Sequence, residues 1–343
     1  MKFMENILSF TSISFTEFLK EKFGKGSYHG NCIYRYFFKT GNTDFENLDC
    51  FVNIDLALAI KDSLILPDVE IADKRESDDV FKFALRLNDG ELIESVILKM
   101  KNRHTLCVSS QVGCKMSCKF CATAKMGFKR NLTVDEITLQ LYTAKFILGY
   151  DIRNIVFMGM GEPLDNYENV RKAILIFNDQ HGFDMAFAHI TLSTSGLADV
   201  VERLGKDNMI RPNLSVSLNS GDNKIRKELM PITKKFDLKY LKKVLLNYPL
   251  KRKGIIFITY TLFKGVNDSK EDAKKLFSYV RDLPCRINLI PYNAVEECGF
   301  IPCSDGDINR FAGYLETYDL FVRKRWTKGA ELDAGCGQLA AKI

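Results

Sequence analysis

The chain has 343 residues, 46% of them hydrophobic and 27% charged, which is typical of a globular protein with a sizeable core. The longest apolar run, residues 254–263, is too short to span a bilayer, and the first residues contain no signal-peptide core, so we expect no membrane contact and a cytoplasmic location. In that compartment the ten cysteines favour thiol or metal chemistry over a disulfide framework.

The chain begins with two segments of different character. Residues 1–75 are predicted to form a small helical accessory domain, which contains a basic and aromatic patch, SYHGNCIYRYFFK. In residues 76–103 the apolar residues alternate on both sides of Asn88, Asp89 and Gly90, which predicts a β-hairpin extension.

From residue 104 onward, predicted strands alternate with predicted helices. One helix is expected to begin at Thr133, because Thr133 and Glu136 have the spacing of a capping box. Strands are expected at residues 104–109, 154–160, 189–194, 213–218, 254–260, 285–290 and 320–326, and further helices at 167–177, 197–205, 237–246, 268–281 and 305–318.

This alternation predicts an α/β fold with parallel strands joined by crossover helices. About six units suit a partial or full β/α barrel over residues 104–326, followed by a tail over residues 327–343. The competing architecture is a doubly wound sheet, but no Gly-rich dinucleotide fingerprint follows the first strand.

The formal net charge of +6 indicates an anionic partner only weakly, but its distribution is uneven. The cationic residues crowd into one segment, and solvated helix faces explain this as well as a nucleic-acid contact does. They are Lys224, Arg226, Lys227, Lys234, Lys235, Lys239, Lys242, Lys243, Lys251, Arg252 and Lys253.

Three cysteines, Cys114, Cys118 and Cys121, have the spacing C-x3-C-x2-C. Thiolates are soft ligands that suit zinc or an iron–sulfur cluster. A structural zinc site uses four protein ligands, and the sequence has no second C-x2-C pair to complete one. Three thiolates on a four-iron cluster would leave one iron open to an exogenous ligand, which is our preferred interpretation.

The cysteine motif, with Phe120 before its last cysteine, resembles that of the radical S-adenosylmethionine (SAM) enzymes. Further segments resemble the RlmN/Cfr adenine methyltransferases of that superfamily, over residues 75–343. They are TLCVSSQVGCKMSCKFCATAKMGFKRNLTVDEI, FMGMGEPLDN, ITLSTSGL, SLN with ELMPI, INLIPYN and ELDAGCGQLA. The resemblance implies a partial (β/α)6-type radical SAM barrel, and the accessory domain is compatible with the RNA-binding domain of that family.

The resemblance also implies the cofactors and the reacting residues. Cys114, Cys118 and Cys121 would hold a [4Fe-4S] cluster, and two molecules of SAM would be used per turnover. Cys336 would accept a methyl group from the first SAM, and Cys107 would release the product by forming a disulfide. Glu94 matches the proton acceptor proposed in the family, whereas its strand pattern alone predicts an exposed residue.

SAM contacts are expected where polar residues follow the strands. Gly161 and Glu162 would meet the methionyl amine, because glycine permits close approach and a carboxylate suits an ammonium group. The other expected SAM contacts are Ser193, Ser217, Leu218, Asn219 and Asn293. Asn219 stands where the family usually has histidine, which places that contact in question.

The expected function is methylation at C2 of an adenosine in 23S rRNA, and possibly in tRNA. The alternatives are methylation at C8, action on another RNA, and a cluster-bearing RNA-binding protein without catalysis. Intact Cys107 and Cys336 argue against the last alternative, because binding alone needs neither of them. The expected partners are RNA and an electron donor such as flavodoxin or ferredoxin, and the expected state is a monomer.

Overall fold

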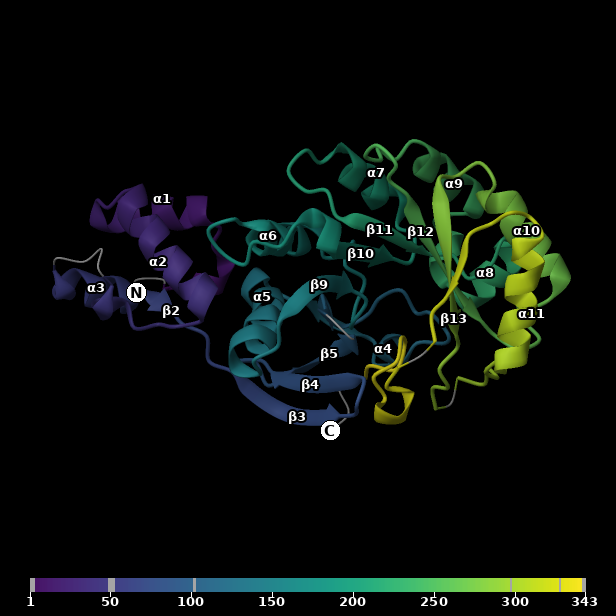
Figure 1. Ribbon diagram of the computed structural model, residues 1–343, viewed down its shortest axis with the longest axis horizontal. Helices are drawn as coiled ribbons and strands as arrows, with labels where there is room; N and C mark the ends of the chain where they lie inside the picture. Colours follow the sequence, from purple (N-terminus) through teal and green to yellow (C-terminus); the bar gives the residue numbers. More distant parts are fainter. Residues whose placement is uncertain (1–3, 49–52, 101–102, 297, 327, 341–343) are drawn as a thin grey trace.

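The computed structural model describes residues 4–48, 53–100, 103–296, 298–326 and 328–340. Its central feature is a ten-stranded sheet with the order β14-β13-β12-β11-β10-β9-β6-β5-β4-β3 (Figure 1). Seven of these strands follow one another in sequence order and pair in parallel, which is the arrangement of a barrel and not of a doubly wound sheet. The partial barrel predicted from the sequence is therefore confirmed.

The parallel strands match the expected ones within a few residues. Most of their side chains that face the helices or the barrel interior are buried and apolar. They are β6 (Arg103–Cys107), β9 (Ile152–Phe157), β10 (Ile190–Thr194), β11 (Asn213–Ser217), β12 (Ile256–Leu262), β13 (Cys285–Pro291) and β14 (Val322–Lys324).

The expected hairpin is confirmed as β4 (Val80–Arg86) and β5 (Leu92–Met100), which pair antiparallel and extend the sheet from β6. A further strand, β3 (Glu70–Glu76), pairs with β4 at the edge. This strand crosses the expected boundary at residue 75, so the start of the extension lies earlier in the chain than the hairpin signal indicated.

The helices that connect the parallel strands lie on the outer side of the sheet (Figure 1). The capping box at Thr133 and Glu136 is present at the start of α5. The sequence did not predict the short α4 and α8 or the small antiparallel pair β7 and β8. The bounds are β7 (Gln111–Gly113), α4 (Ala122–Lys125), β8 (Phe128–Asn131), α5 (Val134–Tyr142), α6 (Tyr167–Asn178), α7 (Ala198–Lys206), α8 (Asn223–Leu229), α9 (Leu238–Leu246), α10 (Lys270–Val280) and α11 (Asp305–Glu316).

The N-terminal region is mainly helical, as expected, and lies at one end of the molecule (Figure 1). Its helices are held by an aromatic core, and Phe37 stacks on Tyr142 of α5 with 5.5 Å between ring centroids. The elements are β1 (Glu5–Asn6), α1 (Ser12–Phe23), α2 (Ser27–Thr40), α3 (Ile54–Lys61) and β2 (Leu64–Ile65).

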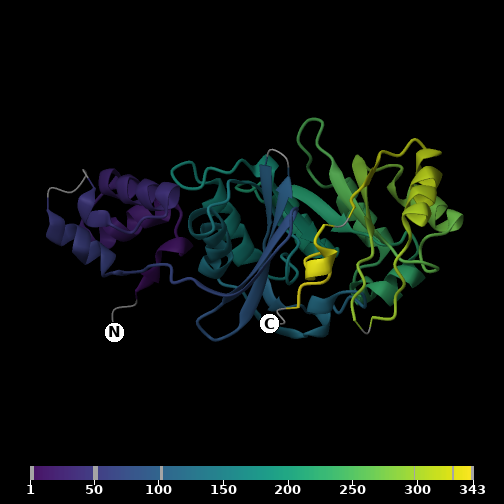
Figure 2. The same ribbon diagram turned by 60° about the horizontal axis from the view of Figure 1, so that its bottom comes forward.

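The chain after β14 returns toward the antiparallel strands, where it lies across them near the middle of the molecule (Figure 2). We refer to residues 328–340 as the tail. Lys328 forms an ion pair of 2.8 Å with Asp79, and Gly329 lies against the side chain of Val80. No helix in the described part of the chain is long and apolar enough to cross a membrane.

Candidate active site

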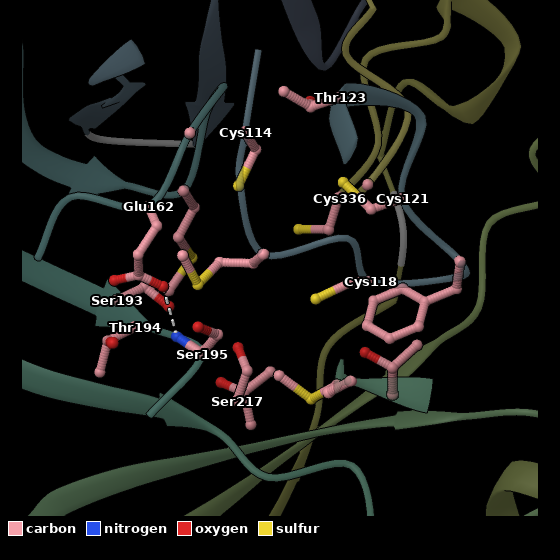
Figure 3. A pocket seen from close by; sticks show the side chains of 18 of the residues that line it. Cys114, Cys118, Cys121, Thr123, Glu162, Ser193, Thr194, Ser195, Ser217 and Cys336 are labelled. Carbon is pink, nitrogen blue, oxygen red and sulfur yellow. Dashed lines mark hydrogen bonds between the residues drawn. The ribbon is translucent and has the colours of Figure 1, made fainter. Parts of the chain in front are cut away.

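A cavity opens at the carboxyl ends of β9, β10 and β11, where polar residues follow the buried strands. The loop that contains Cys114, Cys118 and Cys121 covers one side of it, and Cys336 of the tail reaches in beside them (Figure 3). Ser195 and Glu162 line the opposite wall (Figure 3). Residues distant in sequence thus share one cavity.

The three cysteines of the motif are thiols that burial keeps protonated unless a cation is bound. Burial raises the pKa of Cys114 to about 12, and it raises the pKa of Cys118 and Cys121 as well. The negative charge of one thiolate further raises the pKa of the others. Three thiolates in this cavity therefore require a positive metal centre to be stable.

The three thiols line one cavity without converging on a single point. Among the described residues, no three Cys, His, Asp or Glu side chains converge as closely as the ligands of one metal ion do. A [4Fe-4S] cluster instead holds each thiolate on a different iron. The cavity between the three sulfurs is where such a cluster would be held (Figure 3).

Glu162 is fixed by backbone groups of the next strand. Its two carboxylate oxygens accept hydrogen bonds from the backbone N–H of Ser195, at 2.7 Å, and of Leu164, at 3.2 Å. Burial raises the pKa of Glu162, while these hydrogen bonds act in the opposite direction. The carboxylate is thus held at the cavity wall, in a place where it can accept from an ammonium group.

Gly161 has a φ of +97°, which only glycine adopts without strain. A Cβ atom at this position would lie 2.6 Å from Cβ of Gln111. Gln111 also accepts a hydrogen bond from the backbone N–H of Glu162, at 2.9 Å. The glycine therefore allows two loops to meet closely and so places Glu162.

We expect Gly161→Ala to weaken SAM binding about tenfold, because the new methyl group displaces Gln111 and an alanine at positive φ costs about 1–2 kcal/mol. Equilibrium binding of SAM to the anaerobically reconstituted protein measures this effect. Gly313→Ala in α11 is the matched control, because a Cβ atom there meets no heavy atom within 4 Å. Unchanged SAM affinity in Gly161→Ala would contradict the role assigned to this turn.

The remaining expected SAM residues divide into two groups. Ser193, Ser217 and Asn219 line the cavity. Leu218 and Asn293 are not among its lining residues: the carbonyl of Leu218 accepts from Arg226 at 3.1 Å, and the Asn293 side chain donates to the carbonyl of Cys336 at 3.0 Å. SAM contacts at these two positions stay predictions, and Asn293 has in addition a hydrogen bond to the tail.

Asn219 has a local reason to be asparagine. Its φ is +57°, in the left-handed region that asparagine adopts more readily than most residues. Its side-chain oxygen accepts from the backbone N–H of Thr261 at 2.8 Å, which joins β11 to the end of β12. The amide is therefore partly used to hold the strand ends together.

Arg226 is a site residue that the sequence analysis placed among the surface cations. It is instead 0% exposed, and its guanidinium donates to the carbonyls of Ser195 and Leu218 and to the hydroxyl of Thr233. It therefore ties the ends of β10 and β11 together directly behind the cavity wall. The cationic segment around Arg226 did not indicate that this residue is buried, because in the sequence a buried arginine cannot be told from exposed ones nearby.

Cys336 reaches the cavity because both of its neighbours are glycines. A Cβ atom on Gly335 would lie 2.6 Å from the Asn293 side chain, and Gly337 has a φ of +86°. The carbonyl of Gly337 accepts from the backbone N–H of Ala122, at 2.8 Å, directly after Cys121. The Cys336 side chain is exposed to the cavity. The loss of surrounding water raises the pKa of its thiol, and the nearby Arg325 lowers it.

Cys107 ends β6 and is not among the residues that line either cavity. Burial raises the pKa of Cys107, and the negative charge of Cys336 raises it further. Both cysteines are free thiols. Direct contact between the two thiols stays a prediction.

Glu94 is buried, contrary to the exposed position that its strand alone indicated. It lies on the other side of the tail from the cysteine cavity and lines a second cavity of about 600 Å³. Cavities of this size take small organic groups. Other charged residues that line it are Arg75, Lys82, Lys125, Glu296 and Asp333.

A cavity at the strand ends of a partial barrel, with three motif cysteines on its rim, defines a radical SAM enzyme. The family model of the Radical SAM superfamily matches residues 108–277. Its members bind a [4Fe-4S] cluster and SAM, and these are the cofactors of this protein.

The particular family follows from more similar proteins. The chain is 40% identical over 339 residues to the probable dual-specificity RNA methyltransferase RlmN 1 of Protochlamydia amoebophila, covering 97% of this chain and 93% of that protein. It is 38% identical to the dual-specificity RNA methyltransferase RlmN of Geobacter sulfurreducens, covering 99% and 94%. The chain belongs to the RlmN family of radical SAM RNA methyltransferases.

A solved structure agrees with this assignment. The crystal structure of a radical SAM methyltransferase from Sphaerobacter thermophilus has a TM-score of 0.91 and 31% sequence identity to the chain, and it covers 98% of this chain and 100% of that one. The likeness extends over the helical N-terminal region and the tail as well as the barrel.

Proposed function

We propose that the protein methylates C2 of an adenosine in 23S rRNA, and also in tRNA, through a methyl-cysteine at Cys336. The observation that carries this proposal is the position of Cys336 in the same cavity as Cys114, Cys118 and Cys121 (Figure 3). The curated relatives are named dual-specificity RNA methyltransferases, which supports both RNA classes as substrates.

Each residue has a chemical task in this proposal. Cys336, as a thiolate, displaces the methyl group from the sulfonium of one SAM. When bound, the cluster and a second SAM supply the electron and the radical chemistry that remove a hydrogen atom from this S-methyl group. The single electron that remains once the S-methyl carbon is bonded to C2 would pass to the cluster, and Glu94 would accept the ring proton from the side of the second cavity. The Cys107 thiolate would then attack Sγ of Cys336, forming the Cys107–Cys336 disulfide as the C–S bond breaks. The electron pair of that bond would take up a proton, which completes the new methyl group and frees the base.

The binding roles proposed for the other residues follow from the cavity. Gly161 and Glu162 meet the methionyl amine of SAM, and Ser193, Ser217 and Asn219 contact the rest of it. The helical region before β3 is the accessory domain that contacts the RNA, β3 to β5 form the extension, residues 104–326 the barrel and residues 327–343 the tail. The protein acts in the cytoplasm as a monomer, with flavodoxin or ferredoxin as electron donor.

Mass spectrometry of nucleosides from ribosomal and transfer RNA, prepared from cells with and without the gene, tests the proposal. We expect 2-methyladenosine to be lost from both RNA pools when the gene is deleted. Loss of 8-methyladenosine instead would assign the alternative ring position. Identical nucleosides in both strains would leave the cluster-bearing RNA-binding protein as the better description.

A further inference from the structure

The side of the sheet that faces the tail contains a buried ion pair. Lys82 of β4 and Glu94 of β5 are 4% and 2% exposed, and Nζ of Lys82 lies 2.8 Å from Oε1 of Glu94. Lys82 is opposite Val96 and Glu94 is opposite Ala84 in the strand register. The two are therefore diagonal neighbours on one face, within reach of long side chains.

Each member of this pair also binds the main chain of the tail. Nζ of Lys82 donates to the carbonyl of Asp333 at 3.1 Å, and Oε2 of Glu94 accepts from the backbone N–H of Ala340 at 2.9 Å. These two contacts lie on either side of Cys336 in the sequence. The pair therefore holds the segment that carries the reactive thiol at both of its ends.

The same segment separates the two cavities. Cys336, Gly337 and Leu339 line the cysteine cavity, whereas Asp333, Gln338 and Ala340 line the second one. A shift of this segment would change which cavity the thiol faces. The residues that hold it consequently decide where Cys336 lies relative to SAM.

A buried ion pair is a costly way to join two strands, since packed apolar side chains do this as well or better. What apolar side chains cannot supply is a donor for the Asp333 carbonyl and an acceptor for the Ala340 N–H. The hydrogen bonds to the tail therefore explain why charged residues, and not apolar ones, occupy positions 82 and 94.

We propose that Lys82 is a positioning residue, which acts with Glu94 to clasp the tail so that the Cys336 thiol faces the cysteine cavity. Lys82 pairs with Oε1 of Glu94 and so orients the other carboxylate oxygen toward Ala340, and it holds the Asp333 carbonyl directly. The expected effect on methylation of Cys336 rests on the proposed function. The hydrogen bonds by which Lys82 and Glu94 hold the tail do not depend on it.

The first test is Lys82→Met, which keeps the length of the side chain but removes the cation. Hydrogen exchange of the peptide that contains residues 333–340 should become about tenfold faster, because two of the hydrogen bonds that hold the segment weaken, one on each side of Cys336. Intact-protein mass spectrometry should show Cys336 methylation by SAM slowed by about the same factor. Iron content and SAM affinity should not change, because Lys82 does not line the cysteine cavity.

Arg86→Met is the matched control, since Arg86 lies on the same strand and pairs with Glu70 without contacting the tail residues 333–340. It should leave both exchange and methylation as in the unmodified protein. Unchanged exchange of the tail in Lys82→Met would overturn the proposal. Faster exchange in Arg86→Met as well would also overturn it, because the effect would then belong to the sheet in general.

A second variant tests the clasp if Lys82→Met fails to fold. Ala340→Pro removes the N–H that donates to Glu94, fixes the backbone φ of residue 340, and leaves both members of the Lys82–Glu94 pair in the protein. It should speed exchange of the tail and slow Cys336 methylation, and normal values for both would overturn the proposal. If the unmodified protein never methylates Cys336, the proposed function fails, and hydrogen exchange still decides on the clasp.

Discussion

Cys336→Ala and Cys107→Ala are expected to stop methylation of RNA at different steps. Cys336→Ala has no sulfur to accept a methyl group, so neither methylated protein nor methylated RNA should form. Cys107→Ala keeps Cys336 in the cavity, so it can accept the methyl group and join it to the base. It lacks the thiol that breaks this link, and a covalent protein–RNA adduct should accumulate.

The adduct is measured as a nuclease-sensitive shift on a denaturing gel, and the methyl group on Cys336 by mass spectrometry. Cys285→Ala is a suitable control, because Cys285 is a half-buried free thiol on β13 that lines neither cavity described above. Normal turnover by Cys107→Ala would contradict the mechanism. An adduct that forms in Cys336→Ala would contradict it equally, since the link would then lie elsewhere.

Replacement of Cys114, Cys118 and Cys121 together by alanine should remove the iron–sulfur cluster completely. The variant removes all three thiols that the motif offers to the cluster, so the cluster loses the ligands that would hold it. Visible absorbance and iron content after anaerobic reconstitution measure the loss. SAM cleavage should be abolished as well.

The fold should survive this triple substitution, because the cysteines lie in a loop outside the ten-stranded sheet. Far-ultraviolet circular dichroism checks that the variant is folded. Retention of iron at the level of the unmodified protein would show that other ligands hold the cluster. A single Cys303→Ala, remote from the cavity lining, should retain iron and serves as the control.

The sequence by itself determined the local elements and the chemistry of the cysteine loop. Periodic apolar runs located the parallel strands, and the capping box located the start of α5 at Thr133. The C-x3-C-x2-C spacing requires no tertiary information, because all three ligands belong to one loop. The same is true of the hairpin, which depends on a turn between adjacent strands.

Only the tertiary structure decided which distant residues meet. The alternation of apolar and polar residues indicates on which face of a strand a side chain lies, but not what covers that face. Glu94 was therefore expected to be exposed, whereas in the structure it is buried and contacts the tail. Arg226 was hidden among surface cations for the same reason, since its acceptors are main-chain carbonyls at the ends of other strands. The clasp of Lys82 and Glu94 on the tail is likewise a contact across about 250 residues, and such a contact exists only once the chain has folded back on itself.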